Sequence, residues 1–481
     1  MARRGRPPLA GRKLRVETFR RSLLHALRCA WPLHGAVPES VSWARLGNRA
    51  ACLFPPILTD SPSSQSRSGG GLFQAKLFRD FSGTMLWQVL GKLFQVVGMV
   101  YATRCLGPDN VGVSRTVITL AMTLQLCLAF GLDAVAVRHV AKGLAKAGDM
   151  APAIFTFRFA LGLLAAVLWG LAVSFSGLEG GEKWTWLVGA LFLLVCCMDY
   201  SWLFQAKEQM PRASRFQLAS SVMASLWFVL FFEKGQAVGS DLYVLLSANA
   251  VVVGVVWWRM SRELGFHCFS PARLAGAGKL LREAWLIWLF NLGYYLLANM
   301  AQVMTYFIIG KNSGGLFGSA QYLVLALQMF LHYFGILMAP RLMVWHKANL
   351  ALFRRRVLMI AGGASMLGVI VFGVLWLVVD WLYPLLFGEA FASAAGLLPW
   401  LVLGKFFAVG TAMFTWGLWA ENRDKLPVLC CLPCCLVSGV LYFVLLPKYG
   451  NAASAWLTLG AETALLIASA IAFILAVRRS K

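Results

Sequence analysis

Long apolar segments separated by short polar stretches fill the chain after residue 80. Twelve segments are long enough to cross a bilayer, because about 20 apolar residues in a helix span its hydrocarbon core. They cover residues 84–103, 113–132, 153–175, 184–204, 217–232, 242–258, 285–309, 317–338, 357–379, 394–419, 427–446 and 453–477. Backbone exposed to lipid must satisfy its own hydrogen bonds, so each segment is expected to be helical. The pattern predicts an all-α polytopic membrane protein with about 12 transmembrane helices.

The basic residues between these segments predict an orientation. Most Lys and Arg residues of the loops lie on the side that both termini share. Positive charge stays with the cytoplasm during insertion, so both termini are expected to be cytoplasmic.

The longest internal loop, 259–284, separates six segments from six. We therefore expect a six-helix lobe at 79–258, a cytoplasmic linker at 259–284 and a second six-helix lobe at 285–481, around a central cavity. Residues 1–78 are basic and rich in Pro, Ser and Gly towards their end. They are interpreted as a disordered cytoplasmic region or the result of a misassigned start.

The net charge of +24 would fit a nucleic-acid-binding protein, but only 13% of residues are charged and 59% are hydrophobic. After residue 80 the basic residues lie mainly at helix ends, where they orient helices and meet anionic headgroups. Membrane lipids are therefore predicted as partners, and nucleic acid is not.

Enzyme signatures are missing from the sequence. It has no Gly-Lys-Ser/Thr phosphate loop, no His-Glu-x-x-His zinc motif and no Asp-x-Asp. The apolar run Cys430-Cys431-Leu-Pro-Cys434-Cys435 has no His or acid nearby, so buried small residues explain it better than a metal site. We predict no catalytic activity, no metal and no cofactor.

Polar side chains form stripes on two of the predicted helices. Gln88, Lys92 and Gln95 share one face of the first helix at spacings of four and three residues. Asn291, Tyr295, Asn299 and Gln302 share one face of the seventh. A charge at mid-span costs roughly 2.5–3.5 kcal/mol and usually faces a cavity or a partner. Two striped helices in matching positions therefore predict a hydrated central cavity whose substrate-binding residues are these seven and Lys405.

Lys405 lies in the tenth segment, so it would place a cation opposite Lys92. Paired cations suit an anionic group such as a phosphate or pyrophosphate. The alternative is that Lys92 pairs with Glu462 or Asp199 as a structural contact. Glu462 in the twelfth segment has two interpretations, a carrier of a coupling proton or half of a buried ion pair. Arg158 and Asp199 lie nearer helix ends, where snorkelling explains them.

Several short motifs resemble those of one transporter family. They are Arg104-Cys-Leu106-Gly107-Pro108 after the first segment, Asp199-Tyr-Ser-Trp202-Leu-Phe-Gln205-Ala-Lys-Glu208 after the fourth, Leu281-Arg-Glu283-Ala before the seventh, Leu386-Phe-Gly388 before the tenth, and Pro447-Lys-Tyr-Gly450 before the twelfth. Their order from about residue 78 onwards resembles the O-antigen-type oligosaccharide flippases of polysaccharide biosynthesis, within the multidrug/oligosaccharidyl-lipid/polysaccharide exporter superfamily. Ala206 departs from the usual Gly, and residues 1–75 have no counterpart.

The resemblance implies a bacterial inner-membrane flippase that works by alternating access. Its substrate would be a polyprenyl-pyrophosphate-linked oligosaccharide repeat unit, moved from the cytoplasmic to the outer leaflet for surface polysaccharide assembly. Coupling to H+ or Na+, and a polysaccharide polymerase and ligase as partners, would follow. A multidrug or small-molecule exporter of the same fold is the alternative function.

Overall fold

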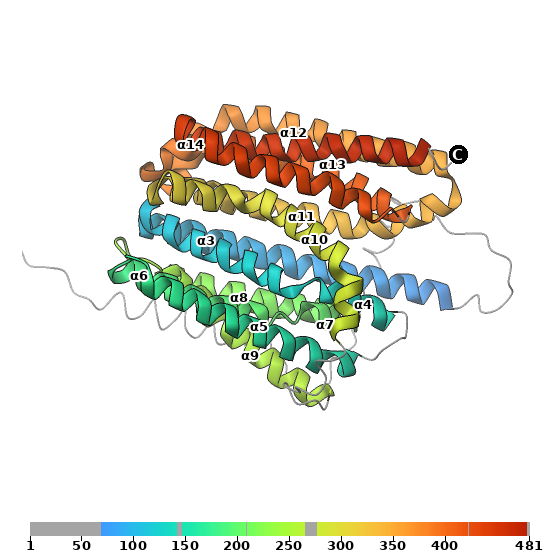
Figure 1. The fold of residues 1–481 in the computed structure, drawn as a ribbon, viewed down its shortest axis with the longest axis horizontal. Helices are drawn as coiled ribbons and strands as arrows, with labels where there is room; N and C mark the ends of the chain where they lie inside the picture. The colour runs from blue at the N-terminus through green and yellow to red at the C-terminus, as the bar shows by residue number, and fades with distance from the viewer. Residues whose placement is uncertain (1–68, 142–146, 208, 265–276, 422, 479–481) are drawn as a thin grey trace, which may run out of the picture. The chain divides into compact units, whose positions relative to one another are not determined.

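The computed structural model describes residues 69–141, 147–207, 209–264, 277–421 and 423–478. It consists of helices joined by short turns, and no strand occurs in these residues (Figure 1). Most of the predicted N-terminal region, residues 1–68, lies outside this description. Residues 69–78, which were included in that region, form the start of the first described helix.

The first seven helices are α3 (Gly69–Ala129), α4 (Leu132–Ala141), α5 (Ala147–Phe175), α6 (Gly180–Cys197), α7 (Ser201–Ala206), α8 (Met210–Phe231) and α9 (Ser240–Leu264). They are followed by α10 (Ala277–Ile308), α11 (Lys311–Ala348), α12 (Leu350–Phe387), the 3-10 helix η2 (Glu389–Leu397), α13 (Leu398–Ala420) and α14 (Lys425–Arg478). Of the described helices, nine are long and apolar enough to cross a membrane.

Two of these nine hold two predicted segments each. The backbone of α3 leaves the helical region at Gly107 and that of α14 leaves it at Gly450, both with positive φ angles of 77° and 62°. Such angles suit glycine, which has no Cβ. The first and second segments, and likewise the eleventh and twelfth, are therefore arms of one kinked element. The eighth segment lies in α11.

The helices fall into two groups. In the first group, α5 packs on α6, α6 on α9, and α8 on α9; in the second, α13 packs on α11, α12 and α14. Figure 1 shows α12 to α14 on one side of α3 and α10, and α5, α6, α8 and α9 on the other. In the most apolar 18-residue stretch of η2 and α13, 83% of the residues are buried, whereas in that of α12 only 17% are buried. α12 therefore exposes apolar side chains as a lipid-facing helix does, while α13 fills the centre of its group.

One apolar cluster joins the two groups. It contains Met99 and Phe228 of the first group together with Phe317, Phe387 and Tyr442 of the second. Many of its members lie close in sequence to the turns at Gly107, Gly310, Gly388 and Gly450. We call the end of the helices where these turns lie the Gly107 end.

At the opposite end, called the Trp202 end, each group has its own cluster. Leu132, Trp202 and Met260 belong to the first group's cluster, and Phe353 and Phe473 to the second's. The two groups also touch there through the start of α10: Trp288 stacks on Phe130 and its Nε1 donates to the Cys127 carbonyl at 3.1 Å.

Candidate central polar site

The polar stripe of the first segment divides between two environments. Gln88 is buried and donates from Nε2 to Ser214 Oγ at 3.1 Å and to Gln217 Oε1, both on α8. It therefore connects α3 to its own group. Lys92 is partly buried, and its Nζ donates to Gln95 Oε1 at 2.6 Å on the same helix. Lys92 has no carboxylate within 4.0 Å among the described residues.

Arg115, on the second arm of α3, is the most notable side chain of the site and was not predicted. It is 7% exposed, and its Nη2 donates to Gln321 Oε1 of α11 at 3.3 Å. Its guanidinium lies over the Tyr322 ring, 4.7 Å from the centroid. Nε has no acceptor among the described residues, and no carboxylate there lies within ion-pair distance of this guanidinium. Arg115 and Lys92 are close enough to interact electrostatically.

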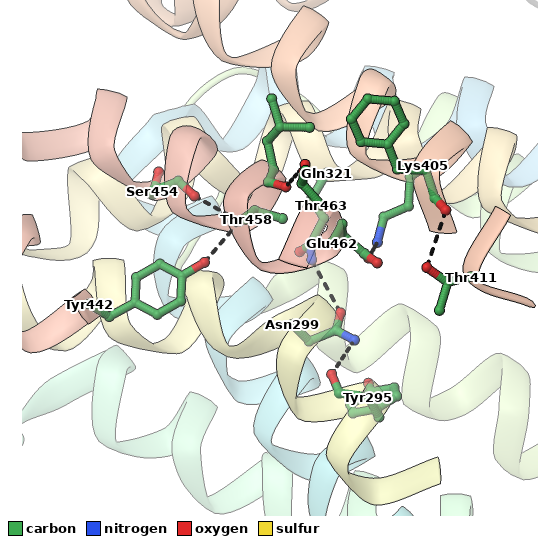
Figure 2. Close-up of polar contacts among 12 residues, drawn as sticks. Tyr295, Asn299, Gln321, Lys405, Thr411, Tyr442, Ser454, Thr458, Glu462 and Thr463 are labelled. Atoms are coloured by element: carbon green, nitrogen blue, oxygen red, sulfur yellow. Dashed lines mark hydrogen bonds and ion pairs between the residues drawn. The ribbon is translucent and has the colours of Figure 1, made fainter. Parts of the chain in front are cut away.

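A hydrogen-bond chain continues from Arg115 into α10. Gln321 Nε2 donates to Asn299 Oδ1 at 3.2 Å, and Asn299 Nδ2 donates to the Tyr295 carbonyl at 3.0 Å. Figure 2 shows Gln321, Asn299 and Tyr295 in line. The seventh-segment stripe thus meets the second arm of α3 through Gln321. We call Lys92, Gln95, Arg115, Tyr295, Asn299 and Gln321 the central polar site.

Gln302 lies at the contact between the two groups and is fully buried. Its Nε2 donates to Thr116 Oγ1 on α3 at 3.1 Å and to the Gly314 carbonyl at 3.0 Å. Both N–H donors are therefore used within the protein. Asn291, the first residue of the same stripe, is exposed on α10. These two residues flank the central polar site and do not belong to its hydrogen-bond chain.

The structure places Lys405 away from the position that sequence spacing suggested. Its Nζ lies 3.1 Å from Glu462 Oε1, and the two side chains are 6% and 0% exposed (Figure 2). The pair joins α13 to α14 inside the second group. The described carboxylates that Lys92 was expected to use as structural partners have other contacts, since Glu462 pairs with Lys405 and Asp199 accepts from Ser201 N and Oγ at 3.0 and 2.7 Å.

Arg158 does not snorkel. Its side chain is 2% exposed and its Nη2 lies 2.6 Å from Asp133 Oδ1, so it forms an ion pair that joins α5 to α4. Trp202 beside it is buried against Phe155, with ring centroids 5.7 Å apart. The Asp199–Gln205 motif therefore forms a packed corner at the Trp202 end.

The arrangement has a clear electrostatic consequence. Two cations of α3, Lys92 and Arg115, interact with each other, and no described carboxylate lies within ion-pair distance of either. The buried carboxylate of Asp241 acts on Arg115 from farther away and accepts from Ser114 Oγ at 2.8 Å. Keeping like charges together in a low-dielectric site is costly unless an anion joins them. Phosphate oxygens and sugar hydroxyls are the groups that guanidinium, ammonium and amide side chains bind.

Sequence reasoning missed Arg115 for a specific reason. It lies only three residues beyond Gly112, near the start of the predicted segment 113–132, where a charged residue resembles the polar end of a helix. The signal was the kink at Gly107: a helix that turns back through a glycine in the apolar core brings the residues after it inside the protein.

Comparisons with known proteins agree with this architecture. Residues 77–342 match the polysaccharide biosynthesis protein family. Comparison with curated protein sequences gives no match. Among solved structures, an inward-facing multidrug resistance MATE family transporter of the MOP superfamily is similar, with a TM-score of 0.63 and 14% identity over 81% of this chain and 94% of that one.

Two further structures share the fold. The lipid II flippase MurJ in an inward closed conformation has a TM-score of 0.61 and 12% identity, covering 82% of this chain and 87% of its own. A MOP superfamily transporter from Pyrococcus furiosus has a TM-score of 0.58 and 14% identity, covering 86% and 98%. At these identities the likeness establishes the fold alone.

The described helices and this likeness indicate a multi-pass membrane protein with the fold that transporters of the MOP superfamily have. Because the family match covers more than half of its length, the chain belongs to the polysaccharide biosynthesis protein family. The family and the structural neighbours are transporters and flippases, not enzymes.

Proposed function

We propose that this protein flips a polyprenyl-pyrophosphate-linked oligosaccharide repeat unit from the cytoplasmic to the outer leaflet of a bacterial inner membrane. The proposal includes alternating access by two six-helix lobes, at 79–258 and 285–481, with both termini cytoplasmic. The family membership and the MurJ-like fold support a flippase of this kind.

One observation carries the choice of substrate: Arg115 is buried, it interacts electrostatically with Lys92, and no carboxylate of the described residues lies within ion-pair distance of it. A cation exporter needs acidic groups where its substrate binds, whereas this pair attracts an anion. In the proposal Arg115 and Lys92 bind the pyrophosphate. Tyr295, Asn299, Gln321 and Gln95 then meet sugar hydroxyls.

The physical need for such a protein is simple. Sugars and pyrophosphate cannot cross about 30 Å of hydrocarbon unaided. A polar site inside the protein would replace their hydration while the lipid chain stays in the bilayer. A polysaccharide polymerase and ligase, acting on the outer leaflet, are the partners that such a product requires.

Gln88, Asn291 and Gln302 support the site in this proposal instead of binding substrate, because Gln88 and Gln302 are hydrogen-bonded within the protein and Asn291 is exposed. Lys405 and Glu462 stabilise the second lobe as an ion pair. A coupling ion, H+ or Na+, completes the proposal, and no residue is assigned to it.

The test is the leaflet distribution of lipid-linked oligosaccharide in cells that lack this protein and any redundant flippase. Accumulation on the cytoplasmic leaflet, relieved by the wild-type gene and not by Arg115→Gln, would support the proposal. Lys448→Gln, which removes an exposed charge at the Gly107 end, is the matched control. An unchanged distribution, together with resistance to cationic dyes on expression, would favour the multidrug exporter instead.

A further inference from the structure

Two turns at the Gly107 end have the same local sequence plan. Gly107 and Gly310 each end a helical arm with positive φ angles of 77° and 129°. In each case a second glycine follows five residues later, at Gly112 and Gly315. With these glycines aligned, Lys92 of the first stripe corresponds to Tyr295 of the second. This register aligns the first half of the chain with the second.

The second glycines pack against each other reciprocally. A Cβ added to Gly112 would strike the carbonyl oxygen of Lys311 and lie 2.9 Å from the backbone nitrogen of Gly315. A Cβ added to Gly315 would strike the carbonyl oxygen of Pro108 and lie 3.0 Å from the backbone nitrogen of Gly112. Each contact is made by backbone atoms, which cannot rotate away as a flexible side chain can.

Polar contacts surround this crossing. Tyr306 Oη donates to Glu182 Oε1 at 2.6 Å, and Lys311 Nζ lies 4.0 Å from Glu182 Oε2. Arg104 Nη2 donates to the Leu385 carbonyl at 2.7 Å. Each of these contacts joins a helix of the first group to one of the second, next to the apolar cluster that joins the two groups at this end.

We propose that the Gly112–Gly315 crossing is the seal that closes the Gly107 end, and that the two groups separate there when the transporter changes state. Glycine is required at both positions because only a residue without Cβ allows the two backbones to meet. At the crossing itself backbone meets backbone, so no side chain has to change its rotamer there when the contact forms or breaks, which suits a seal that opens repeatedly. The inference concerns movement at this end and is independent of the substrate.

The distance between the groups at the Gly107 end tests the proposal. Ketone-bearing residues at the exposed positions Lys234 and Lys448 accept spin labels and leave the native cysteines in place. In the purified full chain, we expect Gly112→Ala and Gly315→Ala each to shift the interspin distance distribution to longer values than in the wild type. Unchanged distributions in both variants, with the protein folded, would overturn the proposal.

Two matched controls separate sealing from folding. Gly98→Ala is also crowded, though less severely, since its Cβ would lie 2.8 Å from Ser225 Cα, and this contact lies within the first group. It should lower the melting temperature without shifting the distances. Gly254→Ala meets nothing within 4 Å and should change neither.

A second measurement serves if both seal variants fail to fold. Asp109 and Asn312 follow the two carbonyls of the crossing and are exposed. In an otherwise wild-type chain, a reducible cross-link between cysteines at these positions should remove the longer distances from the interspin distribution between positions 234 and 448. Reduction of the cross-link should restore those longer distances. A long-distance component that persists in the cross-linked protein would overturn the proposal. These distances do not depend on flipping, so failure of the proposed function would leave them interpretable.

Discussion

Nζ of Lys405 in α13 lies 3.1 Å from Oε1 of Glu462 in α14, and both side chains are buried inside the second group of helices. Neither charge could be tolerated there alone, because moving an ion out of water costs several kcal/mol. The pair therefore explains why two adjacent apolar helices carry charges near their middles. It assigns both residues to the packing of one group.

The first prediction concerns this pair. Lys405→Met leaves the Glu462 carboxylate buried without its partner, and such a change typically costs about 3–5 kcal/mol. The double variant Lys405→Met with Glu462→Gln removes both charges and should recover most of that loss. Thermal unfolding of the purified proteins in detergent measures the order of their melting temperatures, which should rise from the single variant through the double variant to the wild type. A single variant that melts with the wild type would contradict the pair's role.

The second prediction concerns Arg115. Arg115→Gln keeps a hydrogen-bonding side chain next to Gln321 but removes the charge. Hydrogen bonds to charged groups contribute about 1.5–3 kcal/mol, so flipping in reconstituted vesicles should fall by roughly ten- to a hundredfold. Arg115→Lys should be intermediate, because an ammonium lacks the planar fork that binds phosphate through two donors. Equal activity of Arg115→Gln and wild type would place the anion elsewhere.

The third prediction separates Lys92 from a structural role. Its only hydrogen bond among the described residues is to Gln95 on the same helix, so Lys92→Gln should melt within a few degrees of the wild type. Binding of a polyprenyl pyrophosphate should weaken and should depend less on ionic strength, since one screened charge has gone. Titrations at low and high salt measure this. A large loss of stability would point to a contact within the protein instead.

The sequence was sufficient to predict the helices, for a physical reason. Long apolar runs can only become helices in lipid, so the positions of α5, α8, α9 and α12 follow directly from hydropathy. The kinks were harder to predict, because Gly107 and Gly450 resemble ordinary turn glycines. Whether an arm of helix ends or turns back depends on what packs against the glycine, which is a property of the tertiary structure.

The candidate site was predictable only in part. Spacing placed Tyr295, Asn299 and Gln302 on one face of α10, and all three lie near the contact between the groups. Spacing could not show that Lys405 turns to Glu462 while Arg115 turns to Gln321. Both choices depend on distances between helices far apart in sequence. A hydropathy plot treats such buried cations alike, whether or not a carboxylate lies beside them.

The fourth prediction is an asymmetry in the ion pair between Arg158 and Asp133. The Arg158 side chain is 2% exposed, whereas that of Asp133 is 35% exposed. Asp133→Ala would therefore leave a guanidinium buried without its partner, while Arg158→Met would leave a carboxylate that water can still reach. We expect Asp133→Ala to lower the melting temperature more than Arg158→Met, and the double variant to melt above Asp133→Ala. The reverse order would mean that the Arg158 guanidinium has a second stabilising partner, for which Asp199, a carboxylate that interacts electrostatically with Asp133, is the first candidate to test.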